Sequence, residues 1–264
     1  MTDDALLRQA WPPPAPGTAP LARMVRAQAG LELRTMARNG EQLVITLIIP
    51  VLLLVAFGRA DLVSVGPGTR IGFIVPGILS LAVLSTAFTS QAIATGFERR
   101  YGVLKRLGAT PLSRRGLIAA KTVTVLVVEV AQVAIVLAVG AAIGWRPAAS
   151  PAAVVWVPLL LLAGTAAFSG LALLMAGTLR AEATLAGANL LYLIMLGLGA
   201  VLFPLSKFPA GARPVLRLLP ADALADGLRS VLDYSGGVPG TDLLVLCVWA
   251  AAAIALAVRL FQWE

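Results

Sequence analysis

The segment FERRYGVLKRLGATPLSRR, residues 97–115, lies between two long apolar runs, and it decides how the whole chain is organised. Between Arg99 and Lys121 the chain carries seven positive charges, and Glu98 is the acid that precedes them. Each flanking run is long and apolar enough to cross a bilayer as a helix. This basic segment (residues 97–115) is therefore held between two membrane spans, where it could pass motion from a cytoplasmic partner into the membrane.

The composition predicts an integral membrane protein. Of the 264 residues, 59% are hydrophobic and only 13% are charged, against about 25% charged in a typical soluble domain. The apolar runs are continuous rather than alternating, which indicates helices and not a transmembrane barrel. Histidine is absent and the one cysteine, Cys247, lies in an apolar run. Disulfide frameworks and Cys/His zinc sites are therefore excluded within the chain, and no metal site is expected.

The apolar runs predict an all-α integral membrane fold with six transmembrane helices, at about 43–57, 72–95, 117–144, 153–178, 184–205 and 243–259. With six spans both termini lie on one side of the membrane, and 14 of the 21 Lys and Arg residues fall on that side. By the positive-inside rule both termini and the basic segment are cytoplasmic, in a multi-pass protein of the plasma (inner) membrane.

The remaining segments divide into a tail and one domain. Residues 1–20 are polar and Pro-rich with no central apolar run. This pattern favours a flexible cytoplasmic tail over a signal peptide. Residues 21–264 are expected to form a single transmembrane domain.

Residues 21–38 are predicted to form an amphipathic helix on the inner membrane surface. Their basic side chains gather on one side of a helical wheel: Arg23, Arg26, Arg34 and Arg38. The opposite side carries Leu21, Met24, Val25 and Met36. A plain basic stretch beside the first span is the alternative interpretation.

The long loop at 204–242 is punctuated by prolines, among them Pro204, Pro209 and Pro220, yet half of it is apolar. Pro220 can start a helix, since the N–H that it lacks would have no partner there. Asp226 and Arg229 would lie three residues apart on that helix. We expect short re-entrant helices that dip into the outer leaflet.

Residues 97–108 of the basic segment are interpreted as one amphipathic helix. The apolar side holds Phe97, Tyr101, Val103, Leu104 and Leu107, and the polar side holds Glu98, Arg99, Lys105 and Arg106, with Arg100 at the border. Gly108 and Thr110-Pro111 would end it, because a residue before proline avoids the helical region. Docking of a partner is favoured over simple positive-inside anchoring, which needs charges but no particular order.

Two motifs resemble those of type-2 ABC exporter permeases, and the resemblance spans about residues 21–260. The first is similar to the family's coupling-helix motif and matches it at Glu98, Arg99, Gly102, Leu104, Leu107, Thr110, Pro111 and Ser113, with Val103 in place of the more usual Thr. The second is FPLSKFP at 203–209, followed by the LLP at 218–220 and by Asp226 and Arg229. It is similar to the family's segment between its last two spans. The small drug-export permeases, whose ATPase is a separate chain, are the most similar type.

The resemblance implies the membrane subunit of an ATP-driven exporter, with a hydrophobic or amphipathic substrate such as a drug or lipid. It implies two ABC ATPase subunits beneath the membrane, a second permease copy or a similar permease, contact with membrane lipid, and no nucleic acid. ATP and Mg would be bound by the ATPase, with no cofactor in this chain. The coupling helix would comprise Glu98, Arg99, Arg100, Tyr101, Gly102, Leu104, Lys105, Leu107, Thr110 and Pro111, and residues 21–38 would be the interfacial helix.

The residues themselves also argue that ATP chemistry lies elsewhere. A phosphate-binding loop reads G-x-x-x-x-G-K-S/T, whereas the nearest string, Gly116 to Thr122, lacks the glycine before Lys121. We therefore expect that this chain is not itself an enzyme and does not bind ATP.

Glu129 and Gln132 lie near the middle of the third span, three residues apart. A charged group at mid-bilayer costs about 2.5–3.5 kcal/mol, so such a residue should face the protein interior or a wet cavity. Together with Gln91 and Asn189 they are candidates for a transport path or gate. The alternative is a hydrogen-bonded pin between helices. A gradient-driven secondary transporter that uses Glu129 is the rival function. An intramembrane protease is disfavoured, because the chain lacks histidine and paired intramembrane Asp residues.

Overall fold

The computed structural model describes residues 19–59, 69–147, 151–232 and 237–260, and within these ranges every regular element is helical. Almost all of the expected N-terminal tail, residues 1–20, lies outside the described residues. The all-helical prediction is confirmed for the described part of the chain.

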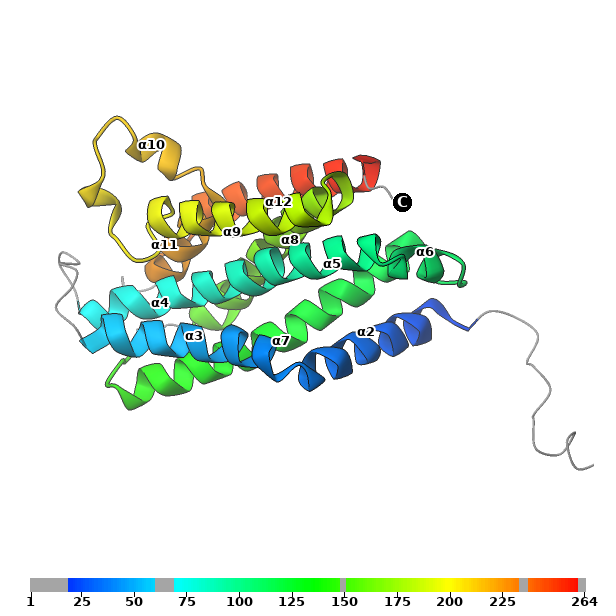
Figure 1. The fold of residues 1–264 in the computed structure, drawn as a ribbon. Helices are drawn as coiled ribbons and strands as arrows, with labels where there is room; N and C mark the ends of the chain where they lie inside the picture. Colours follow the sequence, from blue (N-terminus) through cyan, green and yellow to red (C-terminus); the bar gives the residue numbers. More distant parts are fainter. Residues whose placement is uncertain (1–18, 60–68, 148–150, 233–236, 261–264) are drawn as a thin grey trace, which may run out of the picture.

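Long helices run side by side along the molecule and form its body (Figure 1). In chain order they are α3 (Gly40–Arg59), α4 (Arg70–Val83) with its continuation through the π-helix η1 (Leu84–Ser90) into α5 (Gln91–Arg100), α7 (Arg114–Ala142), α8 (Ala153–Thr178), α9 (Ala181–Leu198) and α12 (Gly240–Leu260). Five described segments are long and apolar enough to cross a membrane, and α3 contributes a shorter apolar stretch, Thr46–Arg59. The chain is therefore a multi-pass membrane protein, and α3 as a sixth span stays a prediction.

The helix α9 ends at Leu198, although the expected span ran to 205. Gly199 closes the helix with its N–H on the Met195 carbonyl, and Ala200 follows with φ of 46°. A left-handed backbone cannot continue a right-handed helix. The chain therefore turns away here and leads into the Pro-rich loop.

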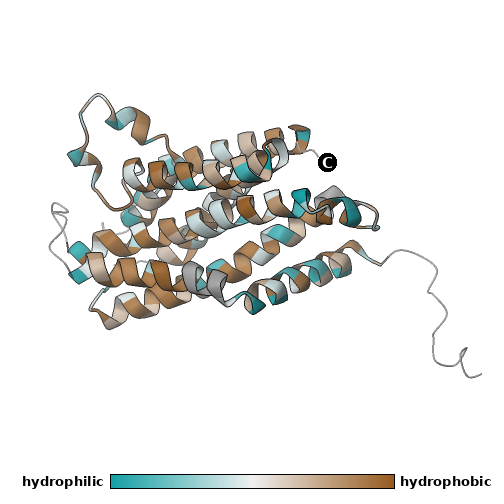
Figure 2. Ribbon diagram, in the orientation of Figure 1, coloured by the Kyte–Doolittle hydropathy of each residue, from teal (hydrophilic) through white to brown (hydrophobic). Residues whose placement is uncertain are grey.

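The rod formed by α4, η1 and α5 is the centre of the bundle. Of the most apolar 18-residue stretch of this rod, 89% is buried inside the molecule, whereas the corresponding share for α12 is 17%. Large apolar side chains such as Leu190, Leu193 and Val248 remain exposed on the outer helices, and Figure 2 shows hydrophobic residues along most of the bundle's helices. In a membrane protein such a surface faces lipid rather than water.

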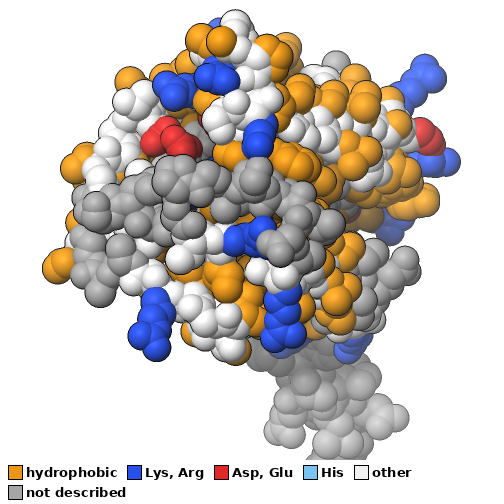
Figure 3. All heavy atoms as spheres, turned by 90° about the vertical axis from the view of Figure 1, so that its left-hand side faces the viewer, with side chains coloured by type: hydrophobic (Ala, Val, Ile, Leu, Met, Phe, Trp, Pro, Cys, Tyr) orange, Lys and Arg blue, Asp and Glu red, His pale blue; other side chains and the backbone are white. Residues whose placement is uncertain are grey.

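One end of the bundle carries the three short helices η2 (Leu205–Lys207), α10 (Arg213–Leu216) and α11 (Pro220–Leu232). We call it the α11 end. The expected short helices therefore exist, and α11 begins at Pro220 as predicted. In Figure 3, which views this end, basic side chains are scattered around the rim with hydrophobic side chains between them. Whether these helices enter the outer leaflet stays a prediction.

The opposite end carries α2 (Leu21–Arg38) and α6 (Val103–Gly108). We call it the α6 end. Figure 1 shows the start of α2 and the end of α12 at this same end. This arrangement agrees with termini on one side of the membrane. The polar residues of α2 and of the α5–α6 turn are gathered here (Figure 2).

Candidate functional site

The basic segment forms two helices rather than the single helix expected over residues 97–108. α5 ends at Arg100, Tyr101 and Gly102 form a turn, and α6 starts at Val103. Gly102 has φ of +68°, a left-handed conformation that glycine adopts without a steric penalty. The break rotates α6 relative to α5, so Tyr101, placed on the apolar side of one continuous helix, is 64% exposed.

The short helix α6 is held by one apolar anchor. Leu104 is fully buried and packs with Leu112 and Leu117, and Met24 of α2 covers this cluster. A helix of six residues has little stability of its own. Its position is therefore set by packing against α2 and the first turn of α7.

The turn from α6 to α7 is fixed by two hydroxyl groups. Thr110 Oγ1 donates to the Leu107 carbonyl at 2.6 Å and accepts from the Leu112 N–H at 3.3 Å. Ser113 Oγ accepts from the Gly116 N–H at 3.2 Å and so caps the N-terminus of α7. Thr110 and Ser113, two matched positions of the motif, thus close one helix and open the next.

The outward face of the basic segment is exposed. Its exposed members include Tyr101, Lys105, Arg106, Thr110 and Pro111. The phenol ring of Tyr101 stacks on Phe97 with ring centroids 6.0 Å apart, and the Arg100 guanidinium lies 5.9 Å from its centroid. This face combines an aromatic ring with basic side chains.

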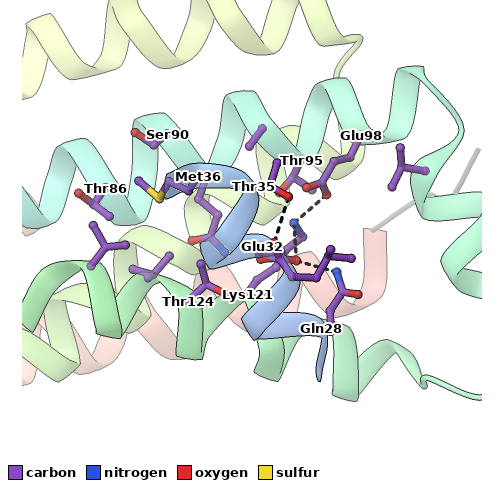
Figure 4. A pocket seen from close by; sticks show the side chains of 16 residues that line it. Gln28, Glu32, Thr35, Met36, Thr86, Ser90, Thr95, Glu98, Lys121 and Thr124 are labelled. Carbon is purple, nitrogen blue, oxygen red and sulfur yellow. Dashed lines mark hydrogen bonds and ion pairs between the residues drawn. The ribbon is translucent and has the colours of Figure 1, made fainter. Parts of the chain in front are cut away.

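Glu98 does not belong to that face, because it points inward to Lys121 of α7. Lys121 Nζ lies 2.7 Å from Glu98 Oε2 and 3.5 Å from Glu32 Oε1 of α2. Figure 4 shows the lysine between the two carboxylates. The Lys121 side chain is only 6% exposed, so this Lys121 cluster (Lys121, Glu98, Glu32) ties α2, α5 and α7 together where the bundle meets the basic segment.

Arg99 and Arg100 reach the other way, to the turn between α8 and α9. Arg99 Nη2 donates to the Leu179 carbonyl, and Arg100 Nη1 pairs with Glu182 in the first turn of α9. The end of α5 is therefore linked to α2 and α7 on one side and to α9 on the other. A displacement of the basic segment would be felt by all of these helices.

The helix predicted at residues 21–38 is present as α2, with matching bounds. Its four arginines, Arg23, Arg26, Arg34 and Arg38, are all exposed, whereas Met24, Val25 and Met36 are half-buried. Leu21, also expected on the apolar side, is exposed at the start of the helix. The buried residue Ala29 marks the side that packs against α7. The amphipathic pattern is therefore real, and a position on the membrane surface stays a prediction.

The four residues proposed for a transport path do not come together. Glu129 Oε2 accepts a hydrogen bond from Thr165 Oγ1 of α8 at 2.6 Å. Gln132 accepts from Thr86 of η1 at 2.8 Å and donates to the Thr46 carbonyl of α3 at 2.8 Å. Gln132 thus pins three helices, which favours the structural interpretation for this residue.

Gln91 and Asn189 have different surroundings from that pair. Asn189 is exposed on the outer side of α9. Gln91 is 6% exposed, and neither amide atom has a hydrogen-bond partner among the described residues. Gln91 lines a pocket between α2, α5 and α7.

The residues singled out in the Pro-rich loop have distinct positions at the α11 end. Pro204 precedes η2, Pro209 is exposed, and Pro220 is buried. Arg229 is 2% exposed. Its Nε and Nη2 donate to the carbonyls of Phe73 and Val201, at 3.2 and 2.7 Å, and its guanidinium lies 3.7 Å from the Phe73 ring centroid.

Asp226, expected as a partner three residues before Arg229, is exposed. The buried acid of α11 is instead Asp222, whose pKa is raised to about 7, mainly by burial and further by Asp226. The hydrogen bonds from Arg229 to the Phe73 and Val201 carbonyls fasten α11 to the start of α4 and to the turn after α9.

Sequence reasoning missed the partners that give the basic segment its connections, namely Glu32, Lys121, Leu179 and Glu182. One signal was available for Lys121, which is the one basic residue inside the predicted span at 117–144. A lysine in an apolar run needs a nearby anion. The sequence does not say which acid is near, since Glu98 and Glu32 are distant along the chain.

Comparison with protein families identifies the chain. The family model described as ABC-2 type transporter matches residues 26–232. The chain belongs to the ABC-2 type transporter family. The match runs from the second turn of α2 to the end of α11 and includes the basic segment and most of the Pro-rich loop. No curated protein matches the sequence.

As an ABC-2 type transporter, the protein is a permease, the membrane subunit of an ABC transporter. Family membership also implies that this ABC-2 permease works with ABC ATPase subunits. The family prediction made from the two motifs is confirmed.

Proposed function

We propose that this ABC-2 permease is the membrane subunit of an ATP-driven exporter, and that the outward face of its basic segment binds the ATPase. The geometry of that segment carries the proposal. α6 presents an exposed aromatic and basic face, while its buried side is anchored by Leu104. A surface that is exposed on one side and rigidly attached on the other can transmit a push.

The route of the push follows from the contacts behind that face. Through Glu98 the motion reaches Lys121 and Glu32, and thereby α7 and α2. Through Arg99 and Arg100 it reaches the α8–α9 turn. In this proposal Glu98, Arg99 and Arg100 are transmission residues, whereas Tyr101, Lys105, Arg106, Thr110 and Pro111 contact the ATPase.

The assembly would contain two ATPase subunits, which bind ATP and Mg, and a second copy of this permease or a similar one. The α6 end and both termini would face the cytoplasm, in a plasma (inner) membrane. Support comes from the excess of Lys and Arg on that side of the predicted topology. A hydrophobic or amphipathic substrate, drug or lipid, would be moved outward.

The test is affinity purification of the tagged permease from its native membrane in mild detergent, followed by an ATP hydrolysis assay. We expect an ATPase subunit to co-purify with the wild type. It should be lost from the double variant Lys105→Glu/Arg106→Glu, because the charge of the contact face is reversed. The matched control is Arg146→Glu/Lys207→Glu, which makes the same charge change on exposed residues of the α11 end.

Retention of the ATPase by the α6 variant would place the contact elsewhere. A wild-type permease without any ATPase, even after crosslinking, would refute the exporter proposal. The remaining candidate would then be the gradient-driven transporter, which one observation favours: Glu129 Oε1 is buried without a partner among the described residues. Glu129→Gln would abolish uptake driven by an ion gradient in that case, with the protein still assembled.

A further inference from the structure

A pocket of about 340 Å³ lies between α2, α7 and the stretch where η1 passes into α5. Figure 4 shows its walls, with α2 on one side, α7 on another, and Thr86, Ser90 and Thr95 along the central rod. Its size is at the lower end of the range for small-molecule sites. Side chains such as Leu31, Val125 and Val128 make most of the lining apolar.

Two buried polar side chains in the lining lack partners among the described residues. They are Gln91, with neither its amide oxygen nor its amide nitrogen bonded, and the Thr95 hydroxyl. Gln91 is 6% and Thr95 1% exposed. Buried polar groups in native proteins are nearly always hydrogen-bonded. The Gln91 amide nitrogen and oxygen and the Thr95 hydroxyl therefore lack hydrogen bonds in one pocket. They point to a ligand that supplies these bonds.

The polar end of the pocket selects the charge of that ligand. Its charged lining residues are Glu98, Glu32 and Lys121. Two carboxylates face one ammonium group, so one negative charge is left over. Glu32 Oε1 also accepts a hydrogen bond from Gln28 at 3.0 Å. A cationic group is therefore attracted here, whereas a phosphate or carboxylate would meet two acids.

The wall that carries Gln91 is formed by an uncommon backbone. The π-helix η1 spans Leu84–Ser90 and ends directly before Gln91. Segments of π-helix inside α-helices are rare and occur frequently at functional sites. One of its residues, Thr86, also bonds to Gln132, so the wall is connected to the hydrogen-bonded centre of the bundle.

We propose that this pocket binds a small amphipathic amine that also carries a hydrogen-bonding group. The apolar body lies among Leu31, Val125 and Val128, the hydrogen-bonding group meets Gln91 and Thr95, and the ammonium group lies beside Glu32 and Glu98. As a statement about the transported substrate class, this inference rests on the proposed export function. As a statement about binding, it does not.

The experiment measures binding of tritiated propranolol, an aromatic amine with a hydroxyl group, to the full-length permease in nanodiscs of phosphatidylcholine without ATP. We expect saturable binding that unlabelled propranolol displaces and that naphthoxyacetic acid, a similar aromatic body with a carboxylate, does not. Gln91→Leu should weaken binding about tenfold, which corresponds to about 1.4 kcal/mol. Thr95→Val should weaken it in the same direction.

Glu32→Gln separates the charge argument from the hydrogen bonds, since it should weaken binding of the amine but not of the corresponding neutral alcohol. The matched control is Thr178→Val, because the Thr178 hydroxyl bonds only to carbonyls of its own helix. That variant should bind like the wild type.

Non-saturable association of propranolol with the nanodiscs, equal for the wild type and Gln91→Leu, would mean that the amine partitions into the bilayer. That result would overturn the inference. So would a phospholipid that co-purifies with the wild type, is lost in Gln91→Leu and is not displaced by the amine. Binding without any accompanying ATPase would refute only the proposed function. ATP hydrolysis by a co-purified ATPase without amine binding would refute only the pocket.

Discussion

Replacing Lys121 by Met tests whether the Lys121 cluster holds the end of the bundle together. The change keeps a long apolar side chain but removes the ammonium group between Glu98 and Glu32. The two carboxylates would then face each other across α5 and α2 without a cation, so the three helices should separate more easily.

The expected magnitude follows from burial. Removing one partner of a buried ion pair costs about 3–5 kcal/mol. Here the carboxylate side chains are 27% and 17% exposed, and solvent screens part of the penalty. We therefore expect Lys121→Met to lower the free energy of unfolding by about 2–3 kcal/mol, a value reduced from the buried-pair figure.

The assay is unfolding of the permease in dodecylmaltoside by titration with sodium dodecyl sulfate, followed by tryptophan fluorescence. Lys207→Met is the matched control, since Lys207 is an exposed lysine of η2, and its change should stay within about 0.5 kcal/mol. Adding Glu98→Gln to Lys121→Met should restore part of the loss, with a coupling energy of about 1–2 kcal/mol. A Lys121→Met protein as stable as the wild type, or two changes that simply add, would refute the role of the cluster.

Three further outcomes follow from local geometry. Gly102→Ala should cost about 1 kcal/mol, because no atom crowds the added methyl group and the penalty comes from the positive φ; Gly102→Asn should cost less, and hydrogen exchange of α6 will report any difference. Gly77→Ala should destabilise the purified protein strongly in a thermal unfolding assay, since its new Cβ meets the Val201 carbonyl, whereas Gly197→Ala has open space and should not. The raised pKa of Asp222, about 7, means that the folded state holds this proton more tightly than the unfolded state; stability from this group is full below about pH 4 and is lost as the pH rises through about 7. Asp222→Asn should flatten that loss in unfolding curves measured from pH 4 to 8, and an unchanged slope would contradict the assignment.

The helices were predictable because a membrane imposes one strong requirement. In lipid every backbone polar group must be satisfied within the segment, so a long apolar run has to be helical. The run at 153–178 became α8 with the same bounds. The run at 184–205 was overestimated, because the sequence around Gly199 is still apolar and only its backbone shows the turn.

The basic segment shows where sequence periodicity stops being informative. A helical wheel treats residues 97–108 as continuous, and Gly102 alone does not exclude that, since glycine is tolerated within helices at a modest cost. The break depends on Leu104, which is buried against Leu112 of the α6–α7 turn and Leu117 of the first turn of α7. That packing favours a turn at Gly102. It involves Leu112 and Leu117, which a helical wheel of residues 97–108 does not include.

Hydropathy and charge along the chain were enough to predict an all-helical membrane protein with a charged segment between two spans, and two motifs indicated the family. These conclusions depend on hydropathy, proline, glycine and charge, all of which act over short stretches of chain. Three facts became visible only in the folded protein: Glu98 faces Lys121 rather than a partner, Arg99 and Arg100 reach the α8–α9 turn and the start of α9, and Gln91 lines a pocket. Each of these contacts joins helices far apart in sequence, and the close packing of those helices selects one partner among several that hydropathy and charge would allow.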